Sequence, residues 1–161
     1  PGETPFALYR WRHVGVRPDE SLIAVTHDAN LDAGILPALT NARDADSGVP
    51  TDTAIWEQLE ERHHQLWQAT RAEHMAENQE MVDQRAQSLR VSHQARRALL
   101  KDQIEAATNA KIRRMKESEL ARAELDYDRR LAELQDAGVR ADIHAAPVVY
   151  GVLSVEAGRG E

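Results

Sequence analysis

The sequence predicts a mainly α-helical α+β fold, a long, coiled-coil-like antiparallel helical hairpin on a small antiparallel β-sheet. Residues 51–137 contain no glycine or proline, which is typical of uninterrupted helix. Strand-forming segments lie on both sides of this region, at 6–16 and 21–26 and again at 148–155. Six of the seven aromatic residues fall near the chain ends or at the start of the helical region, so we expect the core there.

The amino-terminal segments predict a β-hairpin. Residues 6–16 alternate and are rich in strand formers, 17–20 (Arg-Pro-Asp-Glu) form a turn signal, and 21–26 read as a second strand. A short helix is expected over 31–40, before a polar loop at 41–50.

The helical region must contain a turn. Asp52 or Thr53 can cap its start, and Gly138 suits a left-handed residue just past its end. A single helix of this length would extend about 130 Å, too long for a small chain. Thr108-Asn109 is the preferred turn, and Ser88–His93 is the alternative.

Two apolar seams favour an antiparallel hairpin over a parallel homodimeric coiled coil, which stays the alternative. Ile112 and Met115 are expected to extend the second seam toward the turn. The first seam comprises Val82, Ala86, Leu89, Leu100, Ile104 and Ala107, and the second comprises Leu120, Ala123, Tyr127, Leu131 and Leu134.

The expected organisation is one domain, cut from a longer protein. Residues 1–50 form the β-hairpin and loop, 51–137 the helical hairpin arm, and 138–161 a return strand and tail. We expect the return strand to join the hairpin sheet. The apolar residues at the start of the arm should pack against that sheet, namely Trp56, Leu59, Leu66 and Trp67.

Charge is distributed unevenly along the chain. The net charge is −7, but residues 85–116 carry +7. A turn near Asn109 would bring basic side chains from both helices to the tip of the arm, where they suit a phosphate backbone or an acidic protein surface. A solvated helix face, with Lys101–Glu105 and Arg113–Glu117 paired internally, explains the cluster equally well. The candidate contact residues are Arg90, Arg96, Arg97, Lys101, Lys111, Arg113, Arg114 and Lys116.

No pattern predicts catalysis, a metal site or a cofactor in this chain. Glu60 and His63 have the spacing used in di-iron bundles, but no second copy occurs, and an exposed helix face explains them better. A lone pair of His74 with Glu77 falls short of the three or four ligands that zinc requires. The chain has no cysteine and no apolar run long enough to cross a membrane, so we expect a cytoplasmic protein with no membrane partner.

Residues 88–156 also carry a set of short motifs. These are Ser92-x-x-x-Arg96-Arg97-x-x-Leu100, Ala106-Ala107, Ile112-Arg113-Arg114-Met115-Lys116-x-x-x-Leu120, Tyr127-x-x-Arg130, Ala141-Asp142-Ile143 and Val149-x-Gly151-Val152-Leu153-x-Val155-Glu156, with Tyr9-Arg10-Trp11 before the helices. Together they resemble the carboxy-terminal region of large bacterial Swi/Snf-type (RapA-like) helicases, including ones associated with phage defence.

The resemblance implies a parent protein that uses ATP and Mg to translocate on double-stranded DNA or to remodel a protein–DNA complex. Its ATPase motifs would lie outside this chain, and no catalytic residue is carried over. The expected function is therefore a non-catalytic accessory domain whose basic arm contacts double-stranded DNA or the motor domain. The alternative is a structural coiled-coil module for oligomerisation or chaperone-like protein binding, similar to a prefoldin tentacle. A helix-borne metal enzyme is a third and weaker possibility.

Overall fold

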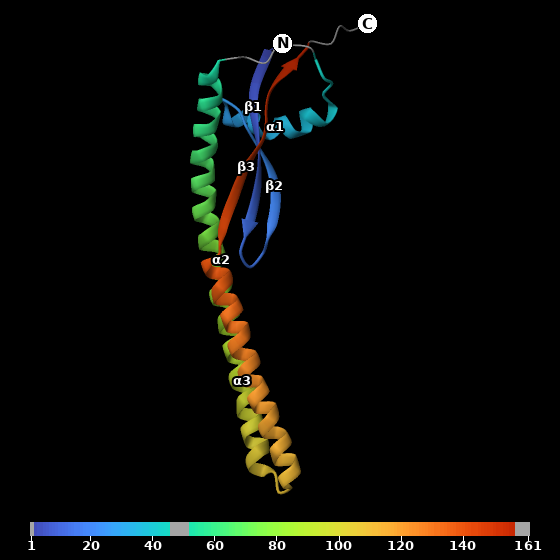
Figure 1. Cartoon of the computed structure of the whole chain (residues 1–161), viewed down its shortest axis with the longest axis vertical. Helices are drawn as coiled ribbons and strands as arrows, with labels where there is room; N and C mark the ends of the chain where they lie inside the picture. Colours follow the sequence, from blue (N-terminus) through green and yellow to red (C-terminus); the bar gives the residue numbers. More distant parts are fainter. Residues whose placement is uncertain (1, 46–51, 157–161) are drawn as a thin grey trace. The chain divides into compact units, whose positions relative to one another are not determined.

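The computed structural model describes residues 2–45 and 52–156. Its elements follow the order β1 (Gly2–Val14), β2 (Asp19–Val25), α1 (Ala29–Asn41), α2 (Thr53–Ala106), α3 (Ala110–Val139) and β3 (Asp142–Val155) (Figure 1). This is the predicted mixed, mainly helical fold class. None of the helices in the described ranges is long and apolar enough to cross a membrane.

The chain divides into two compact units. The sheet unit comprises Pro1–His13, Pro18–Glu73 and Ile143–Glu161. The helical-pair unit comprises Val14–Arg17 and His74–Asp142. Part of the predicted loop at 41–50, and the last five residues of the predicted tail, lie outside the described residues.

The sheet unit is built on three strands in the order β2-β1-β3, so the return strand joins the hairpin sheet as predicted. β1 and β2 pair antiparallel, with Tyr9 opposite Ile23, and β3 runs antiparallel to β1 (Figure 1). β3 begins at Asp142, earlier than the predicted start at 148. The proline in this strand, Pro147, is tolerated because β3 lies at an edge of the sheet.

The middle of β1, residues 6–9, is buried on both faces of the strand. Alternate side chains, Ala7, Tyr9 and Trp11, pack with Leu59 of α2 and Ile143 of β3, forming one core cluster. The intervening residues Phe6 and Leu8 pack with Ile35 of α1 in a second cluster.

The start of α2 packs on the sheet largely as predicted. Leu59 is 1% exposed, and Trp56 and Trp67 lie against the first cluster. The indole Nε1 of Trp67 donates a hydrogen bond to the carbonyl oxygen of Ile143 at 2.9 Å. The prediction for Leu66 is wrong, because this side chain lies on the outer face of the helix and is 41% exposed.

In the helical-pair unit, α2 and α3 run antiparallel to each other (Figure 1). α2 ends at Ala106, and α3 begins at Ala110 with Asn109 as its N-cap. The Asn109 side chain accepts a hydrogen bond from the Lys111 backbone N–H at 2.8 Å. The preferred turn is confirmed, and the alternative at Ser88–His93 is wrong, because α2 is continuous there.

The two predicted seams meet along the helical pair. Val82, Leu100 and Ala123 are buried, and the other seam residues are half-buried. Ile112 and Met115 do not extend the seam, since they are 47% and 52% exposed. Counting back from Leu120 at helical spacing gives positions 116 and 113, so 112 and 115 fall on the outer surface.

Gly138 does not end α3, contrary to the prediction. The helix continues to Val139, and within the described ranges only Gly15 has a positive φ. A Cβ atom at Gly138 would lie 3.3 Å from the side chain of Gln79 and 3.7 Å from that of Val82, both on α2. The missing side chain at Gly138 therefore allows close approach of the two helices.

Asn78 holds together the end of the helical-pair unit opposite the turn at 107–109. It is 0% exposed; its Oδ1 accepts from the Val16 backbone N–H at 2.8 Å, and its Nδ2 donates to the Ala137 carbonyl at 3.2 Å. Gly15, with φ +149°, leaves room for this amide, because a Cβ atom there would lie 2.3 Å from Asn78 Oδ1. One buried side chain thus joins α2, α3 and the turn at 14–17.

Candidate functional site

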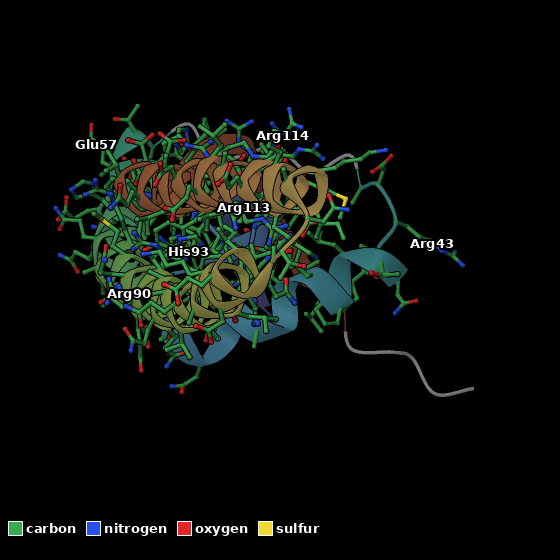
Figure 2. The ribbon with its side chains drawn as sticks, turned by 90° about the horizontal axis from the view of Figure 1, so that it is seen from below. Arg43, Glu57, Arg90, His93, Arg113 and Arg114 are labelled. Carbon is green, nitrogen blue, oxygen red and sulfur yellow. The ribbon has the colours of Figure 1, made fainter. Side chains whose placement is uncertain are left out.

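The eight predicted contact residues lie on both sides of the turn that joins α2 to α3. Seven are exposed, and Lys116 is half-buried. Figure 2 views the helical pair from the turn and shows Arg90 and Arg114 on its outer sides, with Arg113 between the two helices. The members on α2 are Arg90, Arg96, Arg97 and Lys101, and those on α3 are Lys111, Arg113, Arg114 and Lys116.

Two of these cations are paired with carboxylates. Arg97 Nε lies 3.0 Å from Glu124, which also approaches Nε2 of His93 at 3.4 Å. The His93 ring stacks on Tyr127, with centroids 4.2 Å apart. Lys116 Nζ lies 3.5 Å from Glu119. Arg97 thus links α2 to α3, and Lys116 pairs within α3. Both carry less uncompensated charge than the candidate residues that have no carboxylate partner.

Arg113 and Arg114 contact backbone carbonyls near the turn. Arg113 Nη2 donates to the Ala107 carbonyl at 2.8 Å, satisfying an acceptor that the end of α2 leaves free. Arg114 Nε donates to the Ala110 carbonyl at a longer 3.4 Å. Arg113 therefore helps to hold the turn, while Arg114 keeps most of its guanidinium available.

Arg96, Lys101 and Lys111 make no ion pair or side-chain hydrogen bond within the described part of the chain. The internal pairs Lys101–Glu105 and Arg113–Glu117 do not form among these residues either. Both helices therefore carry positive charge that no carboxylate neutralises, on the two sides of the short turn.

Two further arginines, Arg122 and Arg129, were not predicted. With Arg96 they flank a groove of about 460 Å³ between the helices. Both lie outside residues 85–116, the segment with the excess of basic residues, so the distribution of charge along the sequence does not single them out. Helical spacing could have found them, because positions 111, 114, 122 and 129 fall on one face of α3.

Of the Glu60 and His63 pair, only His63 belongs to the core of the sheet unit, and Glu60 is exposed as predicted. His63 is only 9% exposed, so its interpretation as part of an exposed helix face is wrong. Its Nε2 accepts from Trp11 Nε1 at 2.9 Å, and its ring stacks on Tyr9 at 3.4 Å between centroids. Glu60 accepts from the Tyr150 hydroxyl at 2.8 Å.

Burial lowers the pKa of His63 to about 4, with His64 adding to the effect and Glu60 opposing it. A neutral ring matches its role as acceptor for Trp11. His74 is likewise engaged, with its Nε2 2.9 Å from the Val14 carbonyl oxygen. In the ranges 2–45 and 52–156 no three His, Asp or Glu side chains converge in a way that could hold a metal ion.

No protein-family model, curated protein or solved structure matches the chain.

Proposed function

We propose that the chain is a non-catalytic accessory module whose basic tip binds the phosphate backbone of double-stranded DNA. The observation that supports it most is the set of side chains Arg96, Lys101 and Lys111, which carry positive charge from both helices without a carboxylate partner. Arg114 adds a fourth charge on the outer side of α3 (Figure 2).

Phosphate is the ligand that suits these groups because it relieves like-charge repulsion without requiring a shaped pocket. Lysine ammonium groups act as point charges for phosphate, and arginine can also form two parallel hydrogen bonds. The arrangement favours contact with the backbone over reading of base edges.

The motifs in residues 88–156 extend this proposal to a parent protein. In a Swi/Snf-type helicase, ATP and Mg would be bound by motor domains outside this chain, and the arm would contact the same DNA or the motor domain. No residue of the present chain is assigned to ATP hydrolysis.

The proposal is tested by fluorescence anisotropy with a labelled 20-base-pair duplex at low salt. We expect the Lys101→Glu/Lys111→Glu/Arg114→Glu variant to lose at least tenfold in affinity. The matched control is Arg10→Glu/Arg12→Glu/Arg43→Glu, which changes the net charge equally at three exposed positions of the sheet unit. Equal loss in both variants, or no binding by the native chain, would reject the DNA-binding proposal.

A second candidate function is a coiled-coil module for oligomerisation or chaperone-like protein binding. It is favoured by apolar side chains exposed near the tip, with Leu99 at 57%, Ile112 at 47% and Met115 at 52%. Sedimentation velocity separates the two functions. The DNA-binding module is expected to be monomeric, and the coiled-coil module to form oligomers that are indifferent to DNA.

A further inference from the structure

A groove runs along one side of the helical-pair unit, between α2 and α3. It consists of two hollows, of about 630 and 460 Å³. Asp126 connects them, because its carboxylate pairs with Arg129 of the second hollow at 2.6 Å and with Arg130 of the first at 3.1 Å. We call the two hollows together the arginine groove.

The floor of the arginine groove is apolar. Leu89 of α2 and Leu134 and Ala137 of α3, which are half-buried or buried, line the first hollow, and the buried Ala123 lies in the second. Leu125, which is 71% exposed, adds an apolar side chain at the edge of the second hollow. Apolar side chains at this spacing on facing helices form the kind of surface on which a third helix packs.

The rim of the arginine groove carries five arginines against two carboxylates, Asp126 and Glu133, so its net charge is positive. Arg129 and Arg130 share the carboxylate of Asp126. Arg85, Arg96 and Arg122 make no ion pair or side-chain hydrogen bond in the described ranges. Three guanidinium groups therefore remain available, from both helices, beside an apolar floor.

The dimensions of the groove suit a helix of about four turns. Positions 85, 89, 92 and 96 fall on one face of α2 and span about 16 Å at 1.5 Å per residue. On α3 the lining extends from Arg122 to Ala137, about 22 Å by the same rise. The turn at 14–17 borders the first hollow through Gly15 and Val16.

We propose that the arginine groove binds an acidic amphipathic helix of a partner protein. Leucine-like side chains of that helix would cover the floor, and glutamates or aspartates at its edges would pair with Arg85, Arg96 and Arg122. Guanidinium groups suit this role because they bind carboxylates through two parallel hydrogen bonds. A phosphate backbone fits the groove less well, since it would leave the apolar floor without a partner.

Arg96 belongs to both proposed surfaces, but the two proposals can be tested separately, because Lys101, Lys111 and Arg114 lie outside the groove lining. The probe is a fluorescent 18-residue peptide of leucine, alanine and glutamate, with leucine at heptad a and d positions and a lactam bridge that keeps it helical. A bridged peptide of the same composition, with its leucines spread around the helix, is the control. We expect the first peptide to bind at least tenfold more tightly.

Two variants address the groove itself. Arg85→Glu/Arg122→Glu should weaken binding of the peptide at least tenfold, whereas Lys101→Glu/Lys111→Glu, with the same change in charge, should leave it within about twofold. Ser92→Trp should also block binding, because Ser92 is exposed and lines the first hollow, so a large side chain there would occupy space that the peptide needs without changing the charge. Circular dichroism would verify that each variant is folded.

Other outcomes overturn the proposal. Equal binding of both peptides, or equal loss in both charge-reversal variants, would show attraction by overall charge alone. If Arg85→Glu/Arg122→Glu abolishes duplex DNA binding and leaves peptide binding intact, the groove is a phosphate site instead.

Discussion

The sheet unit and the helical-pair unit differ in how they are stabilised. The core of the sheet unit contains large side chains that are almost fully buried, among them Trp11 at 2%, Leu59 at 1% and Ile143 at 1% exposure. In the helical-pair unit, Val82, Leu100 and Ala123 are buried, and most of the seam is half-buried. The sheet unit is thus built around a core, whereas the helical-pair unit exposes most of its side chains to solvent.

The largest effect is expected from truncation in the sheet unit. Leu59→Ala removes a fully buried side chain and should lower the free energy of unfolding by about 3–5 kcal/mol. Leu131→Ala, at a half-buried seam position, should cost only about 1–2 kcal/mol. Urea unfolding of both variants measures the difference, and a cost at Leu131 equal to that at Leu59 would contradict the contrast between the units.

Acid should destabilise the sheet unit through His63. Because the folded state holds the pKa of His63 at about 4 rather than 6.5, only the unfolded chain takes up this proton between these values. The contribution of His63 to the free energy of unfolding is fully present above pH 6.5. It is lost as the pH falls toward 4, by at most roughly 3 kcal/mol.

The measurement is the free energy of unfolding against pH for the native chain and His63→Gln. Glutamine can accept the hydrogen bond from Trp11 but does not titrate, so the variant should lose this part of the pH dependence. Identical pH profiles would show that His63 is not responsible.

A smaller loss of stability is expected in the helical-pair unit, from truncation of Asn78. Asn78→Ala removes the side chain that hydrogen-bonds Val16 and Ala137 and leaves both backbone groups without this partner. The expected cost is about 2 kcal/mol. Amide hydrogen exchange should show faster exchange at Val16 in the variant, whereas Gln79→Ala, at an exposed neighbouring position, should leave it unchanged.

The smallest effect is expected at the ion pair between Arg97 and Glu124. Both side chains are substantially exposed, so Arg97→Ala should change the free energy of unfolding by less than about 1 kcal/mol. Thermal unfolding at low and high salt measures this change in stability. A loss of stability as large as that from Leu59→Ala would contradict the contrast between the two units.

Local sequence patterns predicted much of the fold because they report local chemistry. Asp52 caps α2, accepting from the Ala54 backbone N–H at 3.0 Å, and Asn109 caps α3. The strands of the sheet follow from β-branched and aromatic runs. The exposed positions of Ile112 and Met115 could also have been predicted by continuing the seam at a strict helical spacing.

Contacts between distant residues explain the features that sequence patterns missed. His63 looks like a surface residue until Trp11 and Tyr9, more than 50 positions away, surround it. Gly138 looks like a helix end, but its role depends on the approach of α2. Arg122 lines the same hollow as Arg96 only because α3 returns beside α2.

The most direct test of the proposed function is the salt dependence of duplex DNA binding. With three phosphates neutralised by Lys101, Lys111 and Arg114, a plot of log affinity against log salt concentration should have a slope of about −2.7. Affinity should then fall roughly 40-fold between 50 and 200 mM salt. The Lys101→Glu/Lys111→Glu/Arg114→Glu variant should bind too weakly to show this slope. A slope near zero for the native chain, or one unchanged by the variant, would contradict the assignment of the tip as a phosphate-binding site.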